Sequence, residues 1–320
     1  MIEKLLWHLP FEVDSNSNPF LPGTPFIQLG SCFAGVLAGE MVKIGWPCQP
    51  QPLGIAYNPA SISRHMGYLS GEYSPEKNDF FLFEKRYRHF DFHSDLTAGT
   101  VVKARDLVLA RIEAGKKFLE KAPCVVITLG SSIVHELDSE YIVNNRHKQK
   151  ASLFNPRYLS VAEIIAYMEH IEKVLIDHFN VPQIIWTVSP IRHHRSGLIE
   201  NNRSKARLIL AVQDFIEQKE KHSYFPAYEL LIDVLRDHRF YETDLVHPSQ
   251  QASLWIIEQF VATNFHPSAQ EAWEKLKQFH RLRSHRVIND EPEVQKQHDQ
   301  KVRNARKELK AIYPWFTAGE

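Results

Sequence analysis

The sequence predicts an α/β fold in which a mostly parallel sheet lies between two layers of helices. Two apolar runs rich in β-branched residues, Cys124–Gly130 and Ile184–Pro190, end in turn residues. This pattern is typical of strands that are buried on both faces, and such strands belong to parallel sheets. Long helical patterns separate the runs, and parallel strands need connections of that length. The expected architecture is therefore a three-layer α/β/α domain.

The first strand is expected at Phe26–Leu29, a short apolar run that ends in Gly30 and Ser31. Apolar residues then recur at helical spacing from Cys32 to Ile44, so the pattern predicts a strand, a tight turn and a helix. Three later helical patterns are long enough to cross from one parallel strand to the next: about Ala104–Lys121, Ser160–Phe179 and Asn201–Lys221.

The composition changes near Gln270, where Gln, Lys, Glu, Arg and His begin to dominate. Trp273, Leu276 and Phe279 repeat on one helical face, and Ile288–Pro292 interrupts the pattern. We expect a catalytic domain over residues 20–265 and a pair of charged helices over 266–320. These helices are expected to be a solvated appendage, to pack on the domain or to bind another subunit.

The charge balance argues against a role in binding nucleic acid or membranes. The 320 residues contain 38 Lys and Arg and 38 Asp and Glu, a formal net charge of zero. A neutral chain has no global field that attracts polyanions. Its apolar runs are much shorter than the roughly 20 residues that span a bilayer. We expect a protein with no nucleic-acid partner and no membrane partner.

The N-terminal residues and the cysteines favour a cytoplasmic location. Residues 1–10 lack the small-residue cleavage site of a signal peptide. Three cysteines without a CxxC pair suit a reducing compartment and argue against a disulfide scaffold or a zinc finger. We expect a cytoplasmic protein.

Ser31 is the first candidate for chemistry because it stands where a strand turns into a helix. Ligands of open parallel sheets bind outside the carboxyl ends of the strands. The N–H groups of the following helix would face an oxyanion formed there. The alternative is that Ser31 simply caps the helix, a common role of serine.

Asp244 and His247 form the second candidate. Of the 17 histidines only His247 has an aspartate three positions before it. This spacing lets a turn bring the carboxylate to the imidazole, where it can fix the tautomer and stabilise the imidazolium ion.

The sequence resembles the GSCFA family, a member of the wider SGNH or GDSL-like hydrolase group. Gly30–Ala34 spells the family's name motif, and eight further blocks follow in the family's order. These blocks are Pro52–Pro59, His89–Ser94, Thr128–Ser132, Asn145–Lys148, Val188–His193, Tyr224–Glu229, Leu235–Tyr241 and Asp244–Ser249. The resemblance covers about residues 20–265 and implies a flavodoxin-like sheet of SGNH hydrolase type.

The resemblance implies a catalytic triad of Ser31 as nucleophile, His247 as general base and Asp244 as its orienter. It also implies an oxyanion hole made by the N–H groups of Ser31 and Gly54 and by an asparagine side chain. Ser131 and Ser132 follow Gly130, so the asparagine of the wider group is absent there. Asn145, Asn58 or the Ser131 hydroxyl are the possible replacements.

Further polar residues of these blocks are expected to contact the substrate. Arg192 and His193 follow a strand end and suit a carboxylate or phosphate group; the alternative for Arg192 is an ion pair with a nearby acid. His89 and His93 lie in an aromatic segment that suits a pocket wall or plain packing. The expected substrate-binding residues are Asn58, His93, Ser131, His147, Arg192 and His193.

Cys32 offers an alternative nucleophile. A residue in this position usually faces the core as a small buried side chain, so we expect Cys32 to be structural.

The function we expect is a serine esterase-like hydrolase that cleaves an O-acyl ester of a small molecule or glycan without a cofactor or metal. O-acyl transfer by the same triad remains open. Metal-assisted hydrolysis is a second alternative, but the chain has no HExxH motif. A non-catalytic binding or assembly protein that forms homo-oligomers through its C-terminal helices is a third.

Overall fold

The computed structural model describes residues 10–121, 123–137, 141–192, 197–285 and 292–317. Its centre is a five-stranded sheet with the order β10-β9-β5-β1-β2. Each neighbouring pair runs parallel. This is the flavodoxin-like order. The strands are β1 Phe26–Gly30, β2 Cys48–Pro50, β5 Cys124–Leu129, β9 Ile184–Val188 and β10 His222–Tyr224.

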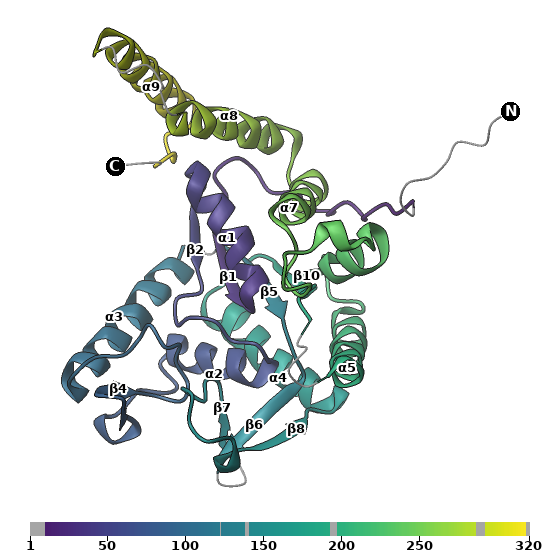
Figure 1. Cartoon of the computed structure of the whole chain (residues 1–320). Helices are drawn as coiled ribbons and strands as arrows, with labels where there is room; N and C mark the ends of the chain where they lie inside the picture. Colours follow the sequence, from purple (N-terminus) through teal and green to yellow (C-terminus); the bar gives the residue numbers. More distant parts are fainter. Residues whose placement is uncertain (1–9, 122, 138–140, 193–196, 286–291, 318–320) are drawn as a thin grey trace, which may run out of the picture.

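Helices cover both faces of the sheet, as Figure 1 shows. One face packs on α1 (Cys32–Ile44) and α7 (Gln250–Asn264) through strand residues such as Phe26 and Val126. The opposite face packs through residues such as Ile127 on four helices. These are α2 (Pro59–Ser70), α3 (Val101–Leu119), α4 (Val161–Glu172) and α5 (Leu198–Ile216). The predicted three-layer α/β/α fold is confirmed.

The predicted helices agree with the observed ones apart from their ends. The pattern from Ser160 onward forms α4 and then a π-helical stretch, Lys173–His178. The helix expected at Asn201–Lys221 begins earlier, at Leu198, and ends at Ile216. It ends early because the chain must turn back before His222 pairs with Ile184 in the edge strand β10.

Two small antiparallel sheets were not apparent from the sequence because their strands are only three to five residues long. A hairpin pairs β3 (Phe81–Phe83) with β4 (Arg86–Arg88). A three-stranded sheet, with the order β7-β6-β8, follows β5 directly. Its strands are β6 Ile133–Leu137, β7 Tyr141–Val143 and β8 Asn155–Tyr158.

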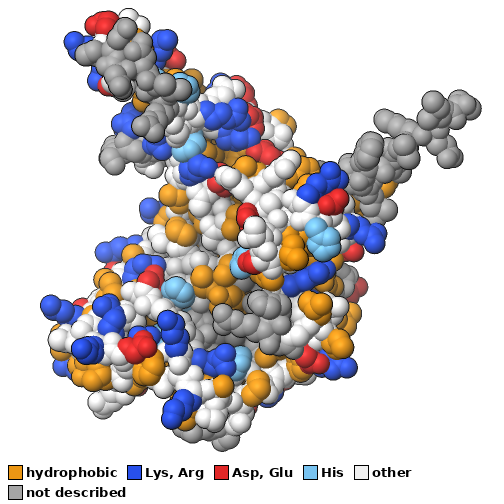
Figure 2. Space-filling view, in the orientation of Figure 1, with side chains coloured by type: hydrophobic (Ala, Val, Ile, Leu, Met, Phe, Trp, Pro, Cys, Tyr) orange, Lys and Arg blue, Asp and Glu red, His pale blue; other side chains and the backbone are white. Residues whose placement is uncertain are grey.

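The C-terminal helices α8 (Pro267–Ser284) and α9 (Pro292–Ile312) project from the domain (Figure 1). Trp273 of α8 is buried and its ring lies 6.1 Å from Trp46 and 5.9 Å from Phe265. Phe26 and Cys124, the first residues of β1 and β5, belong to the same apolar cluster. The base of α8 therefore packs at the amino ends of the strands. Charged side chains of both signs cover the projecting hairpin (Figure 2).

Replacing Trp273 by alanine is expected to lower the free energy of unfolding by about 3–5 kcal/mol, because it leaves a cavity in this aromatic cluster. Denaturant unfolding followed by circular dichroism measures the change. The control is Ile312→Ala, whose side chain is 56% exposed, with an expected change below about 0.5 kcal/mol. Equal effects of the two substitutions would show that α8 is not part of the domain core.

In the part of the chain that the structure describes, no helix is both long and apolar enough to cross a membrane.

Candidate active site

Ser31 stands between β1 and α1, at the carboxyl edge of the sheet. It occupies the N-cap position of α1 with extended backbone, but its side chain makes no capping hydrogen bond. The residue is 2% exposed, and its Oγ has no hydrogen-bond partner among the described residues. The side chain of Ser31 is therefore not used as a helix cap.

The turn at Ser31 is held from several sides. Gly30 has φ +110°, a conformation that favours glycine. Gln51 Nε2 donates to the carbonyl oxygens of Gly30 at 2.8 Å and Ser31 at 2.9 Å. The N–H of Ala56 also donates to Gly30 O at 3.0 Å. These bonds fix the backbone around Ser31 while leaving its hydroxyl free.

Asp244 and His247 meet as their spacing predicts. Asp244 Oδ2 lies 2.7 Å from His247 Nδ1, and Asp244 Oδ1 accepts the N–H groups of Val246 and His247, both at 2.9 Å. The backbone N–H and then the ring of His247 lower the pKa of Asp244 to about 2. The ionised carboxylate can only accept, so Nδ1 carries the proton and Nε2 is left to accept one.

Ser31 and His247 do not bond to each other in this structure, because Ser31 Oγ has no partner among the described residues. The side chains of His247 and Asp244 are 48% and 50% exposed.

The three expected oxyanion donors all have partners within the protein. The N–H of Ser31 donates to Thr128 O at 3.0 Å, and the N–H of Gly54 donates to Gln51 O at 2.9 Å. The Asn145 amide donates to Ser94 Oγ at 3.0 Å, and its oxygen accepts the His147 N–H. An oxyanion would have to compete with these bonds.

The segment around His93 packs against Gly54. A Cβ placed on Gly54 would lie 2.2 Å from His93 Cβ, so only glycine allows this approach. The segment is anchored by the buried carboxylate of Asp91, which accepts from the hydroxyls of Tyr68 at 2.8 Å and Tyr141 at 2.7 Å. The segment around His93 is therefore in contact with the Pro52–Pro59 block.

Four of the expected substrate-binding residues, Asn58, His93, Ser131 and His147, have hydrogen-bond partners within the protein. Asn58 caps α2 by accepting the Ser61 N–H at 2.8 Å. His147 is 2% exposed and its Nε2 lies 2.8 Å from His89 O. Burial lowers the pKa of His147 to about 4, so the ring is neutral near pH 7.

Three of the expected residues lie after β5 and β9. Ser131 Oγ accepts the Ile133 N–H at 2.9 Å and lies 3.2 Å from Ser204 Oγ. Arg192 is half-buried, and its Nε has no partner among the described residues. His193 lies outside the described residues.

Cys32 faces the apolar cluster of α1 and α7, as expected, but it is only partly buried. Its Sγ lies 3.5 Å from the Tyr57 hydroxyl. The loop after β2 brings the Tyr57 hydroxyl to the start of α1, next to this thiol.

A second Ser–His–carboxylate chain joins α2 to α4. Ser63 Oγ lies 2.8 Å from His170 Nδ1, and His170 Nε2 lies 2.9 Å from Glu72 Oε2. Ser63 is 7% exposed within α2, where the N–H groups are bonded along the helix. It lacks free donors for an oxyanion, so we assign this chain a structural role.

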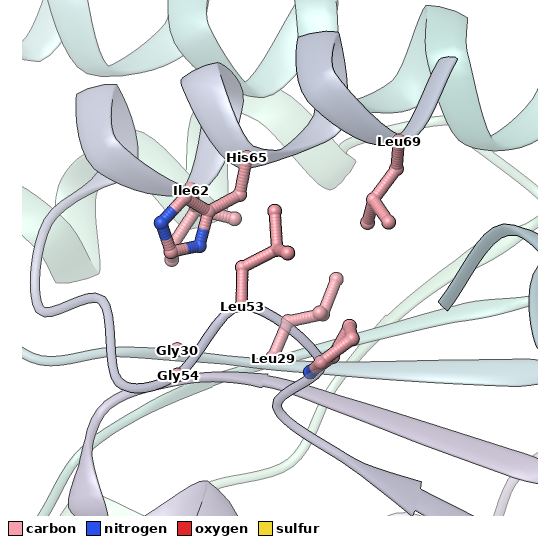
Figure 3. A pocket seen from close by; sticks show the side chains of 8 residues that line it. Leu29, Gly30, Leu53, Gly54, Ile62, His65 and Leu69 are labelled. Carbon is pink, nitrogen blue, oxygen red and sulfur yellow. The ribbon is translucent and has the colours of Figure 1, made fainter. Parts of the chain in front are cut away.

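A small cavity lies beside Gly30 (Figure 3). Leu53 and Gly54 line it from the loop after β2, and His65 and Leu69 point into it from α2. Its lining is mainly apolar, and it has room for about one water molecule. No group of three or more His, Cys, Asp or Glu in the described part of the chain is arranged to hold a metal ion.

Sequence reasoning missed Gln51, which holds the nucleophile turn, and Lys205, which lies at the ends of two strands. Lys205 Nζ donates to Gly130 O at 2.7 Å and Ser189 O at 2.6 Å. A signal was present, because Lys205 shares one face of its helix with the apolar residues Leu208 and Val212. For Gln51 no local signal was present, because its partners lie 20 and 21 residues away in the chain.

Comparisons with known proteins indicate the family of this chain. No curated protein matches the chain. Among solved structures, a carbohydrate esterase family 3 protein from Talaromyces cellulolyticus is similar, with 10% identity and a TM-score of 0.35. The match covers 79% of this chain and 99% of that chain, but a likeness this distant supports no conclusion. The model of the GSCFA family matches residues 25–260. The resemblance seen in the sequence is confirmed, and the chain belongs to the GSCFA family.

Proposed function

We propose that this protein is a serine esterase-like hydrolase that cleaves an O-acyl ester of a small molecule or glycan. Ser31 is the nucleophile, His247 the general base and Asp244 its orienter. The observation that carries the proposal is the Ser31 hydroxyl, which stands at the start of a helix without capping it. A buried hydroxyl without a partner is costly, so its retention at the sheet edge indicates a role in chemistry.

The reaction follows from the atoms available. His247 Nε2 accepts the Ser31 proton while Oγ attacks the ester carbonyl carbon. The tetrahedral intermediate collapses, the bond to the leaving alcohol breaks, and His247 returns the proton to that alcohol oxygen. Water then attacks the acyl-enzyme by the same route, which releases the acid and restores Ser31. Asp244 stabilises the imidazolium ion in both halves.

The start of α1 supplies the oxyanion donors in this proposal. The first N–H groups of a helix have no acceptor within it, and Ser31 does not cap them. The N–H groups of Cys32 and Phe33 are therefore the donors nearest to Ser31, and the helix dipole favours negative charge there. The N–H groups of Ser31 and Gly54 can bind the oxyanion only after their hydrogen bonds to Thr128 O and Gln51 O break.

A fluorophosphonate probe tests this function directly, since it labels only an activated serine. We expect the wild type to be labelled, Ser31→Ala to lose labelling completely and a chelator to have no effect. The control is Cys32→Ala, which removes the neighbouring thiol and should keep the label. Absence of labelling in folded wild-type protein would contradict the proposal, and a label that persists in Ser31→Ala would show that the reactive serine is a different residue.

A further inference from the structure

Lys205 carries a buried ammonium group at the carboxyl edge of the sheet. The residue lies in α5 and is 1% exposed. Its Nζ donates to the carbonyl oxygens of Gly130 and Ser189, at 2.7 and 2.6 Å. No carboxylate among the described residues forms an ion pair with it within 4.0 Å. Burial lowers the pKa of Lys205 to about 7.

The two carbonyls mark the point where neighbouring strands separate. Gly130 follows β5 and Ser189 follows β9, and the N–H of Ser189 still donates to Leu129 O at 2.8 Å. Beyond this point the segments that follow β5 and β9 continue into different loops. The ammonium group therefore joins the ends of β5 and β9 after their ladder has ended.

Ser204, the residue before Lys205, holds the turn that follows β5. Its Oγ accepts the Ser132 N–H at 2.7 Å and lies 3.2 Å from Ser131 Oγ. On the other side, Tyr57 O accepts the N–H groups of Gly130 and Ser131, both at 2.8 Å. The turn Gly130–Ser132 is thus clamped between α5 and the loop that precedes α2.

This turn lies beside the candidate nucleophile. β1 and β5 are neighbours, Gly30 pairs with Thr128, and the Ser31 N–H donates to Thr128 O. The turn begins two residues later, and adjacent strands lie about 4.8 Å apart. A shift of the Gly130–Ser132 turn would therefore change the surface next to Ser31 that a substrate would contact.

A core role alone does not account for a lysine here. A buried cation is expensive, and an apolar side chain of similar length commonly fills such a position at no loss of stability. Buried groups of this kind concentrate at functional sites. The bonds from Nζ to Gly130 O and Ser189 O place this amine at the ends of β5 and β9, and β5 is the neighbour of β1, the strand that leads to Ser31.

We propose that Lys205 is a positioning residue of the candidate active site, whose ammonium group holds the Gly130–Ser132 turn so that a bound ester lies within reach of Ser31. This inference rests on the proposed function. Lys205 itself does not touch the reacting atoms in this scheme.

The test compares Lys205→Met with Val212→Ala. Both substitutions change buried residues of α5, but the apolar side chain of Val212 forms no hydrogen bond with the Gly130–Ser132 turn. With an activated acyl ester as substrate, Lys205→Met is expected to lower kcat by about 10²-fold, because small misplacements near a reacting centre have effects of this size. KM should change less than about threefold. Val212→Ala should lower the melting temperature while kcat stays within about twofold.

Chemical rescue separates positioning from folding. Lys205→Ala leaves space for propylammonium, which should raise the rate of Ser31 phosphonylation by the fluorophosphonate at least about tenfold. Tetramethylammonium, which has the charge but no N–H donor, should not. Phosphonylation is a single event, so the amine cannot act as a competing acyl acceptor.

Ser204→Ala provides a second variant in case Lys205→Met does not fold. It removes the neighbouring contacts to the turn without adding volume and should lower kcat about tenfold. If the wild type is labelled at Ser31 and Lys205→Met keeps a normal kcat, this inference alone is overturned. If Lys205→Met does not fold, a normal kcat in Ser204→Ala overturns it instead. Unlabelled wild-type protein would overturn the proposed function and this inference together.

Discussion

His247→Ala is expected to lower kcat for ester cleavage by roughly 10⁴-fold, because the proposed mechanism gives the Ser31 proton to His247 alone. Ser31 Oγ has no hydrogen-bond partner among the residues that the structure describes, and the carboxylate of Asp244 fixes the proton of His247 on Nδ1. Loss of the base leaves only substrate binding and oxyanion stabilisation, which account for a small part of triad catalysis.

Steady-state hydrolysis of an activated acyl ester measures this effect. The matched control is His178→Ala, an exposed histidine next to Phe179 outside the site, which should keep kcat within about twofold. His247 is half exposed, so its removal should leave the melting temperature nearly unchanged. More than a tenth of wild-type kcat in His247→Ala would rule out its role as the base.

Asp244→Asn extends the same test. The carboxylate accepts from the His247 ring and stays ionised above about pH 2, whereas an asparagine amide can donate to Nδ1 and so favour the wrong tautomer. We expect kcat to fall by at least about 10²-fold with little change in KM. An unchanged kcat would show that the Asp244 contact only shapes the turn.

Gly30→Ala is expected to lower the free energy of unfolding by about 4 kcal/mol or more, because backbone strain and a steric clash act together. Gly30 has φ +110°, and an added Cβ would lie 2.1 Å from the carbonyl oxygen of Thr128. That oxygen belongs to the β5 backbone and accepts the Ser31 N–H, so it cannot move without breaking the nucleophile turn.

Denaturant unfolding of Gly30→Ala and Gly39→Ala gives the comparison. Gly39 lies within α1, and a Cβ there meets nothing within 4 Å. Gly39→Ala should therefore stabilise the protein by about 0.5–1 kcal/mol through the better helix propensity of alanine. A loss below about 1 kcal/mol in Gly30→Ala would show that the turn has more freedom than its contacts indicate.

Local features of this protein were determined by the sequence itself. β1, β5 and β9 lie where apolar runs predict them, since strands buried on both faces need continuous apolar residues. The contact between Asp244 and His247 follows from a three-residue spacing that a single turn can close. The position of Ser31 was apparent because the strand and the helix that it joins lie directly before and after it in the sequence.

Only the tertiary structure decided how the surroundings of Ser31 are arranged. Lys205 meets Gly130 across 75 residues, and Asn145 meets Ser94 across 51. The expected donors of Ser31, Gly54 and Asn145 turn out to have partners, which no local pattern reveals. Such contacts depend on how separate segments pack against the sheet. Packing energy is spread over many distant residues, so a short window of sequence does not contain the information that specifies them.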